Sequence, residues 1–204
     1  MSLPLTIIVA ATKNNGIGQN GSLPWRLPKE MAYFARVTSN SAEGKRNTVI
    51  MGRTSWESIP AKFRPLANRV NIVVTRNAEY DLGLEKPQAP SLRVLGLDSA
   101  FEALKSIPDV HRHFVIGGAS LYEQVLQLDT APALVDRILL TRVLSPDLDC
   151  DTFMPDFTSN PVWQRATHRS LSEWVGFDVP EGVQEEKGIK YEFQMWVRAG
   201  QGLD

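Results

Sequence analysis

The sequence has very little cysteine, no excess charge of either sign and no long apolar segment. Only one of its 204 residues, Cys150, is a cysteine, which excludes an intrachain disulfide and any multi-cysteine metal site. Lys and Arg number 22 against 23 Asp and Glu, whereas a non-specific binder of nucleic acid or anionic membranes carries a basic excess. No apolar run could span a bilayer, and residues 1–4 do not resemble a signal peptide. We therefore expect a cytoplasmic monomer, with a mitochondrial location as the alternative, and neither a membrane nor a nucleic-acid partner.

The remaining composition is that of a compact globular protein. Hydrophobic residues make up 43% of the chain, which is far above the level of disordered proteins and enough for a sizeable core. No internal repeat, low-complexity tract or linker-like stretch interrupts the sequence. We expect a single domain over residues 1–204.

Short apolar runs rich in β-branched residues alternate with helix-like segments. The expected strands are residues 5–11, 48–51, 70–75, 92–95, 113–116 and 138–144. The expected helices are residues 29–38, 55–58, 99–106 and 120–128. Strands that alternate with helices pair in parallel through right-handed crossovers.

Two late segments have a different pattern. Apolar residues alternate in residues 164–177 and 190–198, and the turn-rich stretch 179–188 joins these segments. This pattern predicts an antiparallel hairpin. The expected fold is therefore α/β and doubly wound, with a mostly parallel sheet, helices on both faces and an antiparallel C-terminal edge hairpin.

A glycine-rich loop follows the first expected strand. Gly16, Gly18 and Gly21 match the pattern G-x-G-x-x-G of Rossmann folds, in which the glycines open a helix directly after a strand. Here Pro24 and Pro28 follow, and proline within a helix removes a hydrogen-bond donor and clashes with the preceding turn. We expect a long flexible loop instead, which is either a plain surface loop or a mobile loop beside an active site.

Other strand ends are better suited to bind an anion. Gly52, Gly117 and Gly118 each follow an expected strand and precede a helix. Glycine lets backbone N–H groups approach a phosphate, and a helix N-terminus carries a partial positive charge. Arg53 and Arg76 stand at strand ends as well, where they are either solvated or bind a ligand. Together these junctions predict a dinucleotide site at one edge of the sheet.

One carboxylate, Glu30, lies early in the expected helix 29–38 and beside the apolar Met31 and Phe34. Apolar surroundings raise the pKa of a carboxyl group, which suits it to proton transfer near neutral pH. The alternative is an ordinary acidic residue that the helix dipole stabilises. Trp25, which lies between two prolines, is the tryptophan that we expect to be functional.

The weaker motifs predict no metal site. Residues 147–151 begin like a calcium-binding EF-hand loop, but Thr152 and Thr158 stand where that loop requires glycine and glutamate. His111 and His113 have metal-compatible spacing without an evident third ligand.

Several longer stretches, in order along nearly the whole chain, resemble the dihydrofolate reductase family. They are IVAATKNNGIGQNGSLPW, KEMAYFARVT, VIMGRTSWESIP, FRPLANRVNIVVTR, VIGGASLYEQ, CDTFMPDF and VQEEKGIKYEF. The length and insertions are similar to those of eukaryotic, fungal members. The resemblance implies an eight-stranded sheet and an NADPH-dependent enzyme that reduces 7,8-dihydrofolate to tetrahydrofolate for one-carbon metabolism. It also implies competitive inhibition by antifolates.

The resemblance implies roles for the residues around the substrate. Glu30 matches the family's single acidic residue, which holds the pterin and supports protonation of its N5 atom. Trp25 matches a tryptophan that holds an ordered water, Leu23 a loop residue over the pterin, and Thr141 a threonine that hydrogen-bonds the acid. Arg69 matches the arginine that grips the substrate's glutamate carboxylate. The other substrate-binding residues implied are Ile8, Val9, Met31, Phe34, Ser58, Ile59, Phe63, Leu66, Ile116 and Tyr122.

The resemblance also implies a cofactor site. Residues that match the nicotinamide and pyrophosphate contacts are Gly117, Gly118 and Tyr122. Those that match contacts to the adenosine 2′-phosphate and the adjacent phosphate are Arg53, Thr75 and Arg76. The other cofactor-binding residues implied are Ala10, Ile17, Gly18, Asn20, Gly21, Ser22, Gly52, Thr54, Ser55, Ala119, Ser120 and Leu121.

Two positions depart from the family pattern. Leu95 replaces a further arginine of some members near the cofactor phosphate, and Phe63 stands where others carry an asparagine near the substrate's tail. Two competing functions are a reductase of another pterin- or pyrimidine-like substrate and a catalytically silent nucleotide- or RNA-binding module. The joint presence of Glu30, Leu66 and Arg69 argues against the first. The presence of Glu30 and the two adjacent glycines argues against the second.

Overall fold

The computed structural model describes residues 2–84 and 89–200 of the chain. Within these residues, eight strands form a sheet in the order β10-β11-β7-β1-β6-β3-β4-β5, and a further short strand, β9, also pairs with β11. The six central and edge strands that pair in parallel are β1 (Leu3–Thr12), β3 (Arg46–Gly52), β4 (Arg69–Val74), β5 (Ser91–Val94), β6 (Val110–Gly117) and β7 (Ala133–Ser145). The antiparallel strands are β9 (Trp163–Arg165), β10 (Gln184–Glu186) and β11 (Ile189–Arg198). The predicted mostly parallel, eight-stranded sheet is confirmed.

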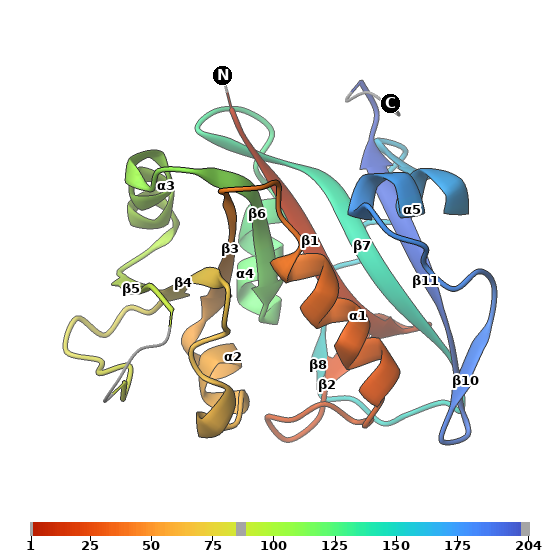
Figure 1. The fold of residues 1–204 in the computed structure, drawn as a ribbon. Coiled ribbons are helices and arrows are strands. Elements are labelled where there is room, and N and C mark those ends of the chain that lie inside the picture. The colour runs from red at the N-terminus through yellow and green to blue at the C-terminus, as the bar shows by residue number, and fades with distance from the viewer. Residues whose placement is uncertain (1, 85–88, 201–204) are drawn as a thin grey trace.

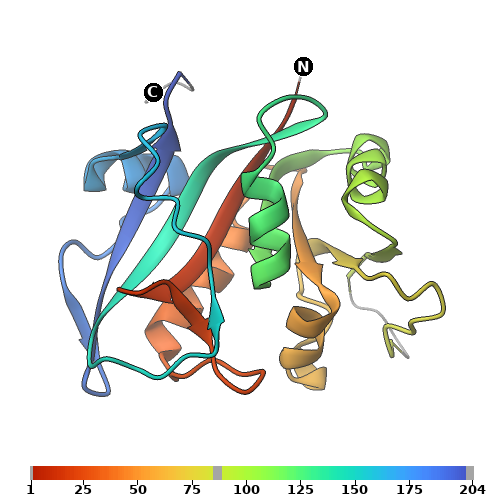
Figure 2. The ribbon, with the colours of Figure 1, turned by 180° about the vertical axis from the view of Figure 1, so that it is seen from behind.

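Helices cover both faces of the sheet (Figures 1 and 2). The helices α1 (Pro28–Ser39) and α5 (His168–Val175) lie in front of the sheet in Figure 1, and α4 (Ala119–Leu126) lies behind it. The shorter α2 (Arg53–Ser58) is followed by a 3-10 turn at Ala61–Phe63, and α3 (Leu97–Ser106) lies near the β5 edge. None of the described helices combines the length and apolarity that crossing a membrane demands.

The core consists of two apolar layers, one on each face of the sheet. Phe101 of α3 and Leu121 of α4 pack with Ile7 of β1 on one face, whereas Trp56 of α2 and Ile8 of β1 belong to the layer on the other face. Successive residues of a strand point to opposite faces. The continuous apolar run of β1 therefore supplies both layers, which explains why it lacks the alternation of a half-exposed strand.

The late segment 164–177, expected to be a strand, is mostly a helix. Thr167 caps α5, because its side chain accepts a hydrogen bond from the backbone N–H of Ser170 at 3.1 Å. The helix ends at Gly176, whose φ of +80° is left-handed. Leu171 and Val175, four residues apart, bury the same face of the helix. The C-terminal edge is antiparallel as predicted, but its hairpin joins β10 to β11 around a two-residue turn, so residues 184–186 form a strand where a turn was expected. Of the expected first arm, only the end in β9 pairs with β11.

The glycine-rich loop is also more ordered than expected. Residues Gly16–Gly18 form β2, which pairs with β8 (Thr152–Phe153). A Cβ atom at Gly16 would lie 2.4 Å from Sγ of Cys150, so only glycine fits there. No helix opens at these glycines, which agrees with the rejection of a Rossmann motif.

The αL ending of α5 gives a stability prediction. We expect Gly176→Ala to lower the free energy of unfolding by about 1–2 kcal/mol, because a left-handed conformation is costly for alanine. Gly176→Asn is the matched control, since asparagine tolerates this conformation better. Urea unfolding measures both variants. Equal losses for Ala and Asn would mean that crowding against Asn40, 3.1 Å from an added Cβ, outweighs the backbone conformation.

Candidate active site

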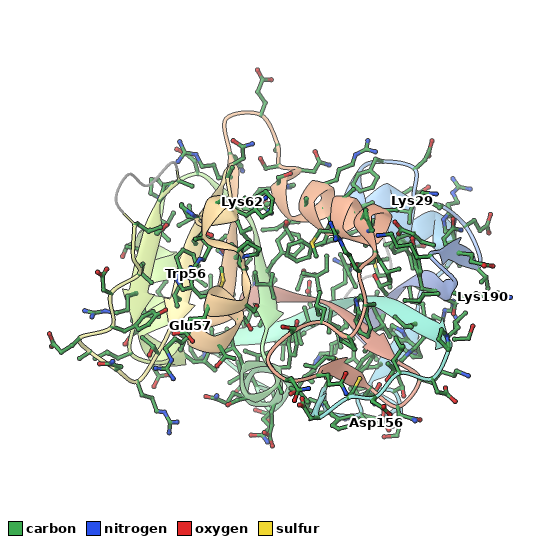
Figure 3. All side chains as sticks on the ribbon, turned by 90° about the horizontal axis from the view of Figure 1, so that it is seen from below. Lys29, Trp56, Glu57, Lys62, Asp156 and Lys190 are labelled. Atoms are coloured by element: carbon green, nitrogen blue, oxygen red, sulfur yellow. The ribbon has the colours of Figure 1, made fainter. Side chains whose placement is uncertain are left out.

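A large cavity opens at the carboxyl ends of the parallel strands. Its volume is about 1910 Å³, and its wall includes residues from the ends of β1, β3, β4 and β6 and from α1, α2 and α4. In Figure 3, Trp56 and Glu57 mark the α2 side of the molecule and Lys29 marks the α1 side. All predicted site residues except Asn20 and Thr141 line this cavity. Open α/β sheets bind ligands at this edge.

Glu30 lies in the first turn of α1 and is only 7% exposed. The hydroxyl of Thr141 on β7 donates a hydrogen bond of 3.0 Å to its Oε1. The pKa of Glu30 is raised from 4.5 to about 7, mainly by burial and also by the negative charge of Glu186, while the Thr141 hydrogen bond opposes the rise. The raised pKa does not fit the alternative of an ordinary acid stabilised by the helix dipole, because such stabilisation of the charged form would lower the pKa.

The loop before α1 brings two further predicted residues to the cavity. Trp25 is 7% exposed, and its buried indole N–H has no hydrogen-bond partner within the described residues. Leu23 is 48% exposed at the cavity wall. The loop therefore supplies two residues to the cavity wall, Trp25 with its buried unpaired donor and the apolar Leu23.

Apolar side chains form the part of the cavity near Glu30. Ile8, Phe34 and Leu66 are buried or partly buried, whereas Met31 and Phe63 are about half exposed. An apolar surface of this kind suits an aromatic ring system. The exposed Phe63 agrees with the expectation of an apolar rim.

Arg69 is a buried cation in the wall of the same cavity. It is 7% exposed, and burial lowers its pKa to about 10. Its Nη1 donates to the hydroxyl of Thr38 at 2.7 Å, and its Nε donates to the carbonyl of Ala67 at 2.8 Å. Among the described residues it has no carboxylate partner. A held guanidinium group without an acid fits an anionic ligand.

Two glycines form a narrow cradle beside the N-terminus of α4. A Cβ at Gly117 or Gly118 would lie 3.0 or 3.3 Å from Oγ of Ser55, and the φ of Gly117 is +128°. The hydroxyl of Tyr122 donates a hydrogen bond of 3.0 Å to the carbonyl of Ile8, which holds α4 against β1. Side chains would fill this cradle, so the absence of Cβ atoms leaves the backbone open to a ligand.

The cationic end of the cavity is more exposed. The guanidinium group of Arg53 lies 3.8 Å from Glu57 and 5.8 Å from the ring centre of Tyr80. Arg76 is exposed, and the adjacent Thr75 is buried. Exposed arginines are free to reorient toward a phosphate.

Two predicted residues lie outside the cavity wall. Thr141 is behind Glu30 and reaches the site only through their hydrogen bond. The backbone N–H of Asn20 donates to Asp151 at 2.7 Å, so this residue faces the loop that carries β8. Sequence spacing does not show how either residue is placed, because each is held by a contact between residues more than 100 positions apart.

The cavity also includes residues that the sequence analysis did not select. Arg26, Lys62 and Arg64 line it, as does Gly96, two residues after the end of β5. The rule that ligands lie at strand carboxyl ends could have found Gly96. Arg26, Lys62 and Arg64 do not follow a strand, so this rule does not predict them.

The sequence motifs predicted no metal site. Within the described ranges there is no group of three or more metal-binding side chains. His113 instead makes a 2.9 Å hydrogen bond with the hydroxyl of Thr48.

The chain matches known proteins along most of its length. A family model for dihydrofolate reductase matches residues 4–197. The chain belongs to the dihydrofolate reductase family. Dihydrofolate reductase of Pneumocystis carinii is 45% identical over 209 residues, and that of Cryptococcus neoformans is 44% identical over 221 residues; the alignments cover 95% of this chain and 96% and 94% of those proteins.

A solved structure gives the same result. Schistosoma mansoni dihydrofolate reductase superposes with a TM-score of 0.76 at 32% identity, covering 97% of this chain and 100% of that chain. The resemblance read from the sequence, including its fungal character, is confirmed. The chain is an enzyme of this family: it reduces dihydrofolate to tetrahydrofolate, with a nicotinamide dinucleotide as the family's cofactor.

Burial of Glu30 predicts a pH-dependent stability. The folded pKa of about 7 exceeds the ordinary 4.5, so the folded state binds more protons, and this contribution to stability is lost as pH rises through 7. Glutamine does not titrate. We therefore compare the free energy of unfolding of Glu30→Gln with that of the unsubstituted protein. We expect this difference to shift in favour of Glu30→Gln by about 2–3 kcal/mol between pH 5 and pH 8. Urea unfolding at several pH values measures this. A difference independent of pH would contradict the assigned pKa.

Proposed function

We propose that Glu30 assists protonation of the pterin N5 atom, that Arg69 binds the glutamate carboxylate of dihydrofolate, and that NADPH is the reductant. The observation that carries the proposal is a single buried carboxylate with a pKa near 7 at an apolar cavity wall. A general acid is most effective when its pKa lies near the working pH. Glu30 meets this condition through burial.

The residues present suit a dinucleotide cofactor. The cradle at Gly117 and Gly118 admits backbone approach, and Arg53 and Arg76 supply positive charge at the outer end of the same cavity. When bound, NADPH supplies the hydride that reduces the pterin at C6. Leu95 lines the cavity at this end and is 53% exposed, so it adds no charge to the phosphate site.

Side chains of the protein orient the substrate and assist protonation of its N5 atom. Glu30 holds the pterin's amino group and N3, and it assists protonation of N5 through water rather than by direct contact. Trp25 offers its unpaired indole N–H to that water. The apolar wall excludes bulk water, which strengthens the electrostatic contacts inside the cavity.

The remaining proposals concern the protein as a whole. We propose that residues 1–204 form one domain, since both core layers share the same sheet. We also propose a monomeric, cytoplasmic enzyme that competitive antifolates inhibit. The balanced charge and the single cysteine support the location.

Replacement of the acid tests the proton route. We expect Glu30→Gln to slow hydride transfer by about 10²–10⁴-fold at neutral pH, because general-acid assistance commonly contributes that factor. The deficit should shrink as pH falls, since solvent then protonates the substrate. Single-turnover measurements against pH exclude product release from the rate. Parallel pH profiles for the two proteins would leave Glu30 as an anchor only.

Replacement of the two exposed arginines tests the cofactor. Each charge-assisted hydrogen bond to phosphate contributes about 1.5–3 kcal/mol. The double variant Arg53→Ala, Arg76→Ala should therefore lose most of the preference for NADPH while its use of NADH barely changes. The ratio of kcat/KM for the two cofactors measures this. Equal use of both by the unsubstituted enzyme would refute the proposal.

A further inference from the structure

The helix that carries Glu30 begins without a cap of its own. The residue before α1 is Leu27, which offers no side-chain hydrogen bond, and the first residue of the helix is Pro28, which has no N–H. The N–H of Met31 already bonds to the carbonyl of Leu27 at 2.9 Å. The N–H groups at the start of a helix need partners from elsewhere. Lys29 is the first residue of α1 that has a free N–H to offer.

That partner comes from the other end of the chain. Both carboxylate oxygens of Glu186 accept from the backbone N–H of Lys29, each at 3.1 Å, across 157 residues of sequence. Glu186 is the last residue of β10 and pairs with Ile189 across the turn Lys187–Gly188. Both turn residues have positive φ, 51° and 76°, as the two-residue turn favoured in hairpins requires. The hairpin therefore fixes Glu186 at the start of α1.

We propose that Glu186 is a positioning residue for Glu30: its carboxylate, held by the C-terminal hairpin, fixes the first turn of α1 and places a negative charge on the backbone N–H of the residue that precedes Glu30. The inference rests on the proposed role of Glu30. Nothing in the family resemblance assigned a function to Glu186, although it lies within the stretch VQEEKGIKYEF.

No described cation forms an ion pair with the carboxylate of Glu186. In Figure 3 the side chains of Lys29 and Lys190 lie on the same side of the molecule, yet among the described residues neither forms an ion pair with Glu186. The hydroxyl of Tyr191 donates a hydrogen bond of 3.4 Å to Oε2 of Glu186. The negative charge is therefore partly exposed but not neutralised.

Among the described residues, Glu186 is the acidic side chain whose charge acts on Glu30. The other groups that face Glu30 are neutral near pH 7: Thr141 on β7, Tyr33 on α1, Tyr122 on α4 and Tyr191 on β11. Burial raises the pKa of each of these tyrosines, that of Tyr191 to about 12. These tyrosines therefore add no charge near Glu30 at neutral pH, and the negative charge of Glu186 raises the pKa of Glu30.

The test separates the charge of Glu186 from its hydrogen bond. Glu186→Gln keeps an oxygen that can accept from Lys29 but removes the charge, and Glu186→Ala removes both. Glu185→Gln is the matched control, because the neighbouring Glu185 is exposed and its side chain makes no hydrogen bond or ion pair within the described part of the chain. The readout is single-turnover hydride transfer from pH 5 to pH 9, together with the pH titration of the Glu30 carboxyl carbon by ¹³C NMR.

We expect Glu186→Gln to move both midpoints to lower pH by about half a unit, which slows hydride transfer at pH 7.5 about threefold. At pH 5.5 its rate should equal that of the unsubstituted enzyme. Glu186→Ala should show the same midpoint and, in addition, a lower rate at every pH, because the first turn of α1 is no longer held. Glu185→Gln should leave the profile unchanged.

The outcomes distinguish this inference from the function on which it rests. A Glu186→Gln midpoint that does not move, when Glu30→Gln does change the pH profile as expected above, overturns the role of Glu186 and leaves that of Glu30 intact. A uniform loss of rate with an unshifted midpoint overturns it as well, because that is the signature of a purely structural cap. If Glu30→Gln itself leaves the pH profile unchanged, the proton route through Glu30 fails.

Discussion

The site depends on one carboxylate that the fold keeps almost free of water. Glu30 is placed by α1, held by a hydrogen bond from β7 and surrounded by the apolar ends of the central strands. Burial disfavours its charged form and brings its pKa to about 7. The same burial makes the ionised side chain unfavourable to stability at higher pH. Burial of Glu30 therefore both suits it to proton transfer near neutral pH and lowers the stability of the protein at higher pH.

The parallel sheet explains why so many polar groups share one cavity. Each parallel strand ends at the same edge, so the residues that follow β3, β4, β5 and β6 meet there although they are far apart in sequence. Backbone N–H groups at a glycine pair and side chains such as Arg53 then face one volume. The antiparallel pair β10–β11 adds a group from the C-terminal end of the chain, because its turn lies beside the start of α1.

The fold was predictable where local pattern and tertiary environment agree. The strands buried on both faces appear as unbroken apolar runs, and the helices between them start and end within a few residues of their expected bounds. The prediction of a strand at residues 164–177 was wrong because the apolar residues there fit both a strand and a helix. Thr167 as a cap and Gly176 as an ending were signals for the helix. The short β2 and β8 depend on pairing across more than 130 residues, which no local pattern encodes.

The sequence by itself determined the family, the parallel sheet, and the chemical character of Glu30, Arg69 and the glycine pair, because these follow from residue type and local order. The tertiary structure alone decided how these groups are held. It joined Arg69 to Thr38, turned Asn20 toward Asp151 and set Glu186 against the N–H of Lys29. Hydrogen bonds act over about 3 Å, so such contacts depend on strand register and turn geometry, and these are fixed only when distant parts of the chain pack together.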